Sequence, residues 1–166
     1  MTVLEGKKAA KYVHDLINRK LQIQINGVDL TIGEVYKFSE QGMLNFDNSH
    51  RKIPKTKLIT PENDWYDLKP GTYLVRYRES VEVPLDCIAL VFPRSSLLRM
   101  GVMLHTAVYD SGYKGRGIGL LIVFNPFGIK LSKDARIGQI VFIRSEKVEK
   151  GYEGEYLGEG LREGEK

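Results

Sequence analysis

The chain has 166 residues and a single cysteine, which is long enough for one domain whose buried core needs no disulfide. No run approaches the roughly twenty apolar residues of a membrane span, and the N-terminus has no hydrophobic signal core. Composition therefore predicts a cytoplasmic protein without a membrane partner and excludes a disulfide-stapled scaffold.

The net charge of +4 is unevenly spread along the chain. Residues 146–166 carry seven Glu against three Lys and one Arg, a net of −3, which leaves +7 on residues 1–145. A basic body suits an anionic partner, either nucleic acid or a small polyphosphate, and composition leaves both open. The basic residues of 52–57 and 76–78 form only a fragment of a nucleic-acid-binding stripe, and such a run is usually a solvated face, so we expect no nucleic-acid partner.

The chain begins with a helical pattern that changes to strands. Apolar residues with helical spacing predict one short helix inside residues 7–20; they are Ala10, Val13, Leu16 and Ile17, continued by Leu21. Residues 21–25 and 28–32 then alternate strictly between apolar and polar side chains. Because Asn26-Gly27 between them is a turn signal, the pattern predicts a hairpin-like pair of strands.

Short strand-like runs follow as far as residue 144, separated by turns rich in Pro, Gly, Asn and Asp. They are residues 57–60, 72–77, 80–83, 87–92, 102–106, 118–124, 129–131 and 137–144. Cys87 lies in one of these apolar runs and is expected to be a core residue. Many short strands joined by tight turns predict an all-β sandwich or barrel.

The last residues differ in character from the rest. Residues 151–160 are rich in glycine and charge and have no apolar face, so we expect a single β domain over residues 1–150 and a mobile C-terminal arm over residues 151–166. A frayed terminus is the alternative. Tyr152 and Tyr156, set among the glycines, favour an arm that closes on something.

Two polar, glycine-punctuated runs carry the chemistry. Pro93-Arg94-Ser95-Ser96-Leu97 places an arginine and two hydroxyls beside a possible helix start, as proteins do to hold phosphate oxygens. The second run, residues 109–115, supplies the acid Asp110 and the aromatic ring of Tyr113. Together they suggest chemistry on a nucleotide.

Five segments in order resemble the trimeric dUTPase and dCTP deaminase superfamily, most closely its archaeal branch. They are Gly27-Val28-Asp29-Leu30, residues 93–101, residues 106–115, Arg136-Ile137-Gly138-Gln139-Ile140, and the ending Tyr-x-Gly-x-Tyr-x-Gly of residues 152–158. Each segment alone is weak, but five in register over residues 8–160 are specific. The resemblance implies an all-β, jelly-roll-like distorted barrel and a homotrimer with active sites where subunits meet.

The superfamily contains two chemistries, and one position separates them. Its deaminases use a glutamate a few residues after the third motif to move protons at cytosine, without a metal. No Asp or Glu occurs between Asp110 and Asp134. The resemblance therefore implies a dUTP diphosphatase that forms dUMP and pyrophosphate, with dCTP deamination, a bifunctional enzyme or a non-catalytic nucleotide-binding module as alternatives.

The resemblance assigns roles at the phosphates. Asp110 matches the catalytic aspartate that polarises the attacking water, although an Asp before Gly also caps turns. Arg94, Ser95, Ser96 and Gln139 match the phosphate ligands. Mg²⁺ is implied, held mainly by the triphosphate through water, so no cluster of metal ligands is expected.

Two further residues have weaker assignments. Tyr113 matches the ring that packs under the deoxyribose, where a 2′-hydroxyl would collide, but a tyrosine in a hairpin is often ordinary packing. The hairpin in question is expected over residues 106–116 and would also select uracil. Asp29 is expected to support the site through water or by holding another motif, or else to be a strand-end residue.

The arm departs from the family pattern. Related enzymes hold phosphates with Lys and Gln near the second tyrosine, whereas Glu155 and Glu159 stand there in this chain, and like charge repels a triphosphate. Either Arg162 takes over that role or the arm contributes little. Arg99, four residues after Ser95, resembles the deaminase version of the second motif.

Overall fold

The longest strand organises the fold. In the computed structural model, which describes residues 2–161, β3 (Gly27–Phe38) has partners along its whole length. Its first half pairs with β2 (Ile23–Gln24) and β13 (Arg136–Arg144), and its second half pairs with β4 (Thr56–Ile59) and β6 (Gly71–Tyr77). All of these pairings are antiparallel. Residues 27–32 are buried, so this half of β3 runs through the interior and not along the surface.

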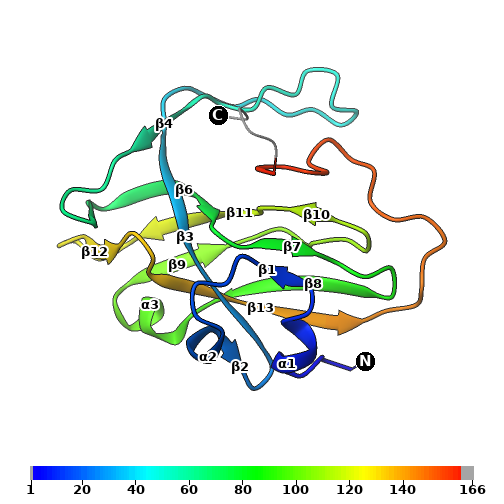
Figure 1. Cartoon of the computed structure of the whole chain (residues 1–166). Coiled ribbons are helices and arrows are strands. Elements are labelled where there is room, and N and C mark those ends of the chain that lie inside the picture. Colours follow the sequence, from blue (N-terminus) through cyan, green and yellow to red (C-terminus); the bar gives the residue numbers. More distant parts are fainter. Residues whose placement is uncertain (1, 162–166) are drawn as a thin grey trace.

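The main sheet extends from β3 on both sides. Its order is β8-β13-β3-β6-β11-β9, with β8 at Cys87–Pro93, β9 at Val102–His105 and β11 at Ile118–Val123. The sheet curls into a nearly closed barrel (Figure 1). The all-β, jelly-roll-like architecture predicted from the sequence is therefore confirmed.

Two small sheets complete the strands. One has the order β1-β7-β10, from Val13–His14, Ser80–Glu82 and Lys114–Gly115, and the other pairs β12 (Ile129–Ser132) with β5 (Trp65–Leu68). The eight strands predicted between residues 57 and 144 match observed strands to within one residue at either end. Strands β1 and β10 were not predicted, because two residues are too few to show a period of two, and β5, with four residues, was also missed.

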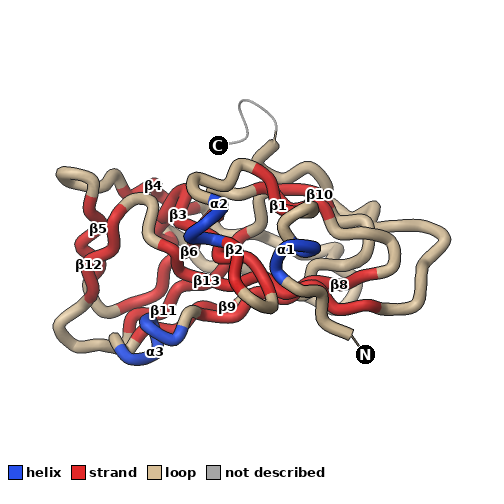
Figure 2. Tube along the Cα trace, turned by 60° about the horizontal axis from the view of Figure 1, so that its bottom comes forward, coloured by secondary structure: helices blue, strands red, loops and turns tan. Residues whose placement is uncertain are grey.

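The helices are short and peripheral (Figure 2). They are α1 (Gly6–Ala9), α2 (Arg19–Gln22) and α3 (Ser95–Arg99), and none found in residues 2–161 is long and apolar enough to cross a membrane. The helix start predicted next to Ser95 is confirmed.

The prediction of one helix inside residues 7–20 was wrong in extent. The chain leaves α1 after one turn because Val13 pairs with Val81 in the small sheet, and Asp15 then takes a positive φ of 62°, which no helix allows. Asn18 starts α2 by accepting a hydrogen bond from the Leu21 amide at 3.2 Å. Consequently Leu21 belongs to α2, and only Ile23–Gln24 of the predicted strand 21–25 is extended.

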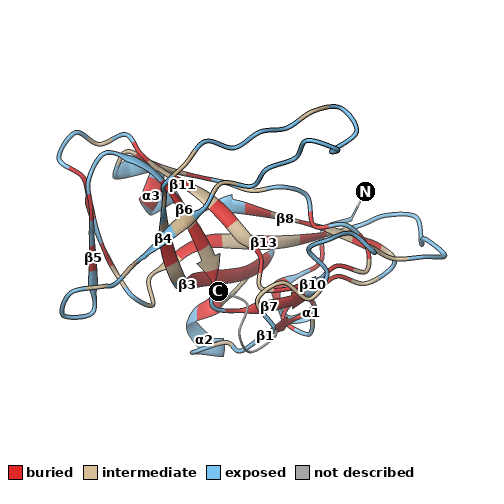
Figure 3. Ribbon diagram, turned by 90° about the horizontal axis from the view of Figure 1, so that it is seen from above, coloured by how far each residue is buried: buried red, intermediate tan, exposed pale blue. Residues whose placement is uncertain are grey.

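The core is built from the inward side chains of the barrel strands. Its largest fully buried apolar members include Leu30, Ile32, Leu121, Ile140 and Phe142. Cys87 is fully buried and burial raises the pKa of its thiol, so it is a core residue as predicted. The buried strands contrast with exposed loops in Figure 3.

A buried carboxylate ties α2, β3 and the turn before β7 together. Glu79 is fully buried and accepts hydrogen bonds from the Thr31 amide at 2.8 Å, the Thr31 hydroxyl at 2.8 Å and Gln22 Nε2 at 2.7 Å. Gln22 Nε2 also donates to the Asp29 carbonyl at 3.0 Å. The backbone of β3 is thus held by two buried polar side chains, at Asp29 by Gln22 and at Thr31 by Glu79.

Burial predicts a pH dependence for Glu79. It raises the pKa of this carboxyl above the usual value, so the ionised form is less favoured in the folded than in the unfolded chain. The contribution of Glu79 to stability is therefore largest at low pH and falls as pH rises through the folded pKa. Because the amide introduced by Glu79→Gln cannot titrate, the melting temperature of the wild type minus that of the variant should be smaller at pH 8 than at pH 4.5. A difference that grows with pH would contradict this.

Candidate active site

A buried carboxylate held between two arginines lies at the centre of one polar cluster. Asp29 on β3 is 2% exposed, and its Oδ2 lies 3.2 Å from Arg94 Nε and 3.1 Å from Arg136 Nη1. Burial raises the pKa of Asp29, and the positive charges of Arg94 and Arg136 offset part of that rise. A charge so far from water needs such partners, and they in turn are fixed by it.

Arg94 is placed by both its backbone and its side chain. Its amide donates to the Ile137 carbonyl at 3.0 Å and its Nη1 donates to the Arg136 carbonyl at 3.3 Å. It is the residue immediately before α3, so Ser95 and Ser96 occupy the first turn of that helix, where both are exposed. The guanidinium side chain is 30% exposed, which leaves it accessible to an anionic group from outside.

Gln139 joins this cluster through strand pairing. On β13 it stands opposite Asp29 of β3 on one side and Phe92 of β8 on the other. Its side chain lies over Gly27, where an added Cβ would come within 3.0 Å of Nε2. A glycine at position 27 therefore makes room for Gln139. The structure thus brings together Asp29, Arg94, Ser95, Ser96 and Gln139.

Asp110 and Tyr113 belong to a second place in the fold. They line a cavity of about 240 Å³ whose walls are largely apolar and aromatic. The other lining residues are Ala107, Val108, Tyr109, Gly117, Ile118, Tyr152, Tyr156 and Glu159. Asp110 is exposed, whereas Tyr113 is 6% exposed. An apolar pocket with one carboxylate at its edge suits a flat ring that carries a polar tail.

In the wall of this cavity, Tyr113 packs against two other tyrosines. The ring of Tyr113 meets Tyr109 edge-on at 5.1 Å and Tyr152 at 5.8 Å between centroids. Burial raises the pKa of Tyr113 well above its usual value, so its phenol stays neutral. Next to them, a Cβ on Gly117 would lie 2.1 Å from the Tyr109 hydroxyl, so any side chain there would collide. Tyr109 was not among the predicted site residues.

Residues 106–116 do not form the predicted hairpin. Tyr109 pairs with Ala89 of β8, whereas Lys114–Gly115 pairs with β7. The Tyr113 amide donates to the Asp110 carbonyl at 3.0 Å and closes a turn in which Gly112 has φ 83°. The two limbs are drawn apart by their different partners, and this separation leaves room for the cavity.

The two clusters do not meet within one chain. Asp110 follows Tyr109, which pairs with Ala89 of β8. Arg94 comes five residues after Ala89, directly beyond the end of the same strand. At the rise of a β-strand this is about 16 Å. Asp110 continues in the antiparallel direction, away from Arg94. The predicted catalytic acid and the predicted phosphate ligands therefore occupy separate half-sites.

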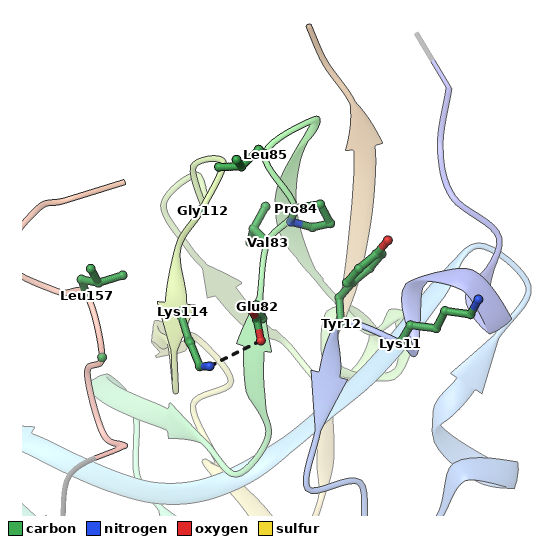
Figure 4. Close-up of a pocket in the computed structure, with 10 residues that line it drawn as sticks. Lys11, Tyr12, Glu82, Val83, Pro84, Leu85, Gly112, Lys114 and Leu157 are labelled. Atoms are coloured by element: carbon green, nitrogen blue, oxygen red, sulfur yellow. Dashed lines mark ion pairs between the residues drawn. The ribbon is translucent and has the colours of Figure 1, made fainter. Parts of the chain in front are cut away.

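A larger cavity of about 720 Å³ lies beside the small sheet β1-β7-β10 (Figure 4). Its lining includes Lys11, Tyr12 and the ion pair of Glu82 with Lys114, whose charged atoms lie 3.5 Å apart. None of the predicted site residues lines it. Its size alone does not make it the candidate site.

Arg136 is the residue that sequence reasoning missed in the first cluster. It opens the fourth motif, and its Nη1 donates both to Asp29 and to the Leu21 carbonyl at 2.6 Å. The signal was available, since a carboxylate inside an apolar strand needs cationic partners. Within residues 2–161, no group of three or more His, Cys, Asp or Glu side chains has the arrangement of a metal site.

Comparisons with known proteins agree on the family to which this chain is similar. The model of the dCTP deaminase-like family matches residues 3–145. A probable deoxyuridine 5′-triphosphate nucleotidohydrolase of Methanosarcina acetivorans is 39% identical, covering 98% of this chain and all of that protein. The deoxyuridine 5′-triphosphate nucleotidohydrolase of Methanocaldococcus jannaschii is also 39% identical, covering 92% of this chain and 97% of that protein.

One solved structure supports the fold. The 2′-deoxycytidine 5′-triphosphate deaminase of Agrobacterium tumefaciens superposes with a TM-score of 0.65 at 20% identity over 84% of this chain. The chain spans about half of that protein, since 47% of it is covered.

Because Asp29 is buried, we expect its replacement to lower the free energy of unfolding more than the replacement of an exposed acid. Asp29→Asn removes the charge that Arg94 and Arg136 share, and we expect the free energy of unfolding at pH 7 to fall by about 2 kcal/mol, less than for fully buried pairs because both arginines are partly exposed. The control is Asp67→Asn, which breaks an exposed pair with Lys69 and should cost less than about 0.5 kcal/mol. Urea denaturation measures both, and equal losses would contradict the role given to Asp29.

Proposed function

The chain belongs to the dCTP deaminase-like family, and on that premise we propose that it is a dUTP diphosphatase, which hydrolyses dUTP to dUMP and pyrophosphate. Relatives about 40% identical over nearly the whole chain carry the name deoxyuridine 5′-triphosphate nucleotidohydrolase. The two half-sites supply what this reaction requires: an acid beside an apolar pocket, and cations with hydroxyls for the phosphates.

One observation favours hydrolysis over deamination. Strand β11 begins at Ile118 in the wall of the cavity, and its residues are all apolar or glycine. Deamination of a cytosine needs a positioned group to move protons at the base, and losing such a group typically costs 10²- to 10⁴-fold in rate. Attack of water at a phosphorus needs no proton transfer at the base.

A second candidate, dCTP deamination, is favoured by one feature of the arm. Glu159 lines the same cavity as Asp110, so a second carboxylate reaches the proposed base pocket. It belongs to the arm and not to β11, where the family's deaminases carry their glutamate. Release of ammonia from dCTP is the direct measure of this alternative.

In the proposed mechanism Asp110 is the general base. Its exposed carboxylate accepts a proton from a water molecule, and the resulting hydroxide attacks the α-phosphorus. A bond forms between that oxygen and phosphorus, and the bond from the α-phosphorus to the α,β-bridging oxygen breaks. Pyrophosphate leaves with the electron pair of the broken bond.

The phosphate half-site stabilises the charge that this step redistributes. Arg94 presents a guanidinium fork, Ser95 and Ser96 present hydroxyl donors, and Gln139 presents an amide. Asp29 is a positioning residue in this scheme, because its carboxylate is already occupied by Arg94 and Arg136. It orients Arg94 and does not itself approach the phosphates.

Mg²⁺ is the proposed cofactor. Of the two site acids, exposed Asp110 fits a metal held through water, whereas buried Asp29 is engaged with two arginines and does not. Bound to the triphosphate, Mg²⁺ would neutralise negative charge on the leaving pyrophosphate.

The apolar cavity is the proposed pocket for the base and sugar. Tyr113 is buried and braced by Tyr109 and Tyr152, so its ring cannot easily move aside. A ring fixed under the sugar would collide with a 2′-hydroxyl and reject ribonucleotides. The neighbouring backbone of residues 106–116 would supply contacts to uracil.

The separation of the half-sites supports a homotrimer with shared sites. Asp110 must lie within reach of the α-phosphorus through one water, while Arg94 must touch oxygens of the same triphosphate. About 16 Å of strand separates their positions in one chain, so a site is complete when Asp110 of one protomer faces Arg94 of another.

The substrate panel tests the proposed function. Purified protein with Mg²⁺ should release pyrophosphate from dUTP and much less from dCTP, dTTP or UTP. Asp110→Asn should still bind dUTP but turn it over at least 10²-fold more slowly, because the water loses its base. Equal turnover of all four nucleotides, or ammonia released from dCTP, would overturn the assignment.

Complementation tests the shared site. Asp110→Asn and Arg94→Ala protomers are each expected to be nearly inactive alone. After unfolding and refolding as an equal mixture, about a quarter of the sites should combine an intact Asp110 with an intact Arg94 from another protomer and so recover activity. A mixture no more active than its components, with native mass spectrometry showing mixed oligomers, would place both residues in the site of one chain.

A further inference from the structure

The acidic side chains of the arm need a role other than binding substrate. Residues 146–166 carry a net charge of −3. The family resemblance implies a phosphate-binding residue close to the position that Glu155 occupies in this chain. A carboxylate would repel the triphosphate there. Arg162, the alternative phosphate ligand of the arm, lies outside the described residues. The structure gives Glu155 a different partner.

The described part of the arm lies along the strand that follows Asp110. The Gly158 amide donates to the Lys114 carbonyl at 2.7 Å, and the Arg116 amide donates to the Glu159 carbonyl at 2.8 Å. These two bonds hold a turn of the arm, in which Gly158 has φ 83°, against the edge strand β10. Farther back, the Tyr152 amide donates to the Ser111 carbonyl at 2.8 Å. The arm thus crosses the turn that carries Asp110.

The loop over residues 39–55 approaches the arm from the other side (Figure 1). Its tip is internally bonded: Asn45 Nδ2 donates to Asp47 at 2.6 Å and to Ser49 at 2.9 Å, and the His50 amide donates to Asn45 Oδ1 at 2.9 Å. The Arg51 amide then donates to the Asn48 carbonyl at 3.0 Å. Arg51 is therefore presented from a structured turn.

Arg51 Nη2 forms an ion pair with Glu155 Oε2, which joins residues 104 positions apart in the sequence. Glu155 precedes Tyr156, whose amide donates to the Tyr152 hydroxyl at 3.3 Å. Tyr152 and Tyr156 both line the cavity of Asp110 and Tyr113. Holding Glu155 in place therefore holds two aromatic side chains in the wall of that cavity.

We propose that Arg51 is the docking residue for the C-terminal arm, and that its ion pair with Glu155 keeps Tyr152 and Tyr156 in the wall of the nucleotide cavity. Arg51 is a positioning residue that acts through the arm. The proposal rests on the proposed function only where it concerns nucleotide binding, since the docking itself is a contact within the protein.

The general charge pattern supports this contact. An arm of net charge −3 is attracted to a body of net charge +7. One defined ion pair then fixes where the arm lies on the body. The side chains are 31% and 55% exposed, so the pair by itself is worth little, and its effect depends on the adjacent backbone bonds to β10. Reversing the charge of Arg51 or Glu155 removes the ion pair and also makes the two side chains repel each other.

The experiment compares amide exchange and kinetics in a charge-swap series. In Arg51→Glu, hydrogen exchange at Gly158 and Arg116 should become about three- to tenfold faster. The KM for dUTP should rise by a similar factor while kcat changes less, because the cavity loses part of its aromatic wall and Asp110 stays in place. The double variant Arg51→Glu with Glu155→Arg should restore both values towards the wild type.

Lys52→Glu is the matched control. Lys52 is adjacent in the same loop and pairs with Glu40, 3.4 Å away, and not with the arm, so its reversal should leave exchange at Gly158 and Arg116 unchanged. The proposal is overturned if Arg51→Glu behaves like this control or if the charge swap restores nothing. Failure of the function is separable, since a wild type inactive on dUTP would leave the exchange result interpretable.

Discussion

The structure depends on one buried charge. Asp29 sits on the half of β3 that runs through the interior, and its carboxylate is tolerated there because Arg94 and Arg136 both reach it. Those arginines come from the ends of different elements, so the interaction joins β3 to the start of α3 and to β13. The same arrangement fixes a guanidinium group at the protein surface. Under the proposed function, a requirement of folding therefore also prepares a phosphate-binding group.

The barrel keeps the predicted catalytic acid and the predicted phosphate ligands apart. Strand β8 leads from the neighbourhood of Asp110 at one end to Arg94 at the other, and an extended strand cannot bring its two ends together. Under the proposed function this geometry requires more than one copy of the chain for each site. The arm lies on the half-site that contains Asp110, where its tyrosines complete an aromatic wall.

Local patterns were informative wherever several residues repeated them. The strands from β4 onward of four or more residues alternate or form apolar runs, and all but β5 were predicted within one residue. The N-terminal helix failed because the spacing of Ala10, Val13, Leu16 and Ile17 is compatible with a helix, while pairing of Val13 with Val81 outweighs it. Arg136 and Tyr109 were missed because their positions depend on residues distant in sequence, Asp29 for Arg136 and Ala89 for Tyr109.

The sequence by itself determined the all-β architecture, the family, the chemical type of each site residue and the absence of an acid on residues 118–124, because these depend on composition, order and spacing. Tertiary structure alone decided that Asp29 is a partner of arginines, that Asp110 and Arg94 stand apart, and that Glu155 meets Arg51. Such facts depend on which segments pair across the barrel. Pairing is set by the packing of the whole chain, and no local pattern records it.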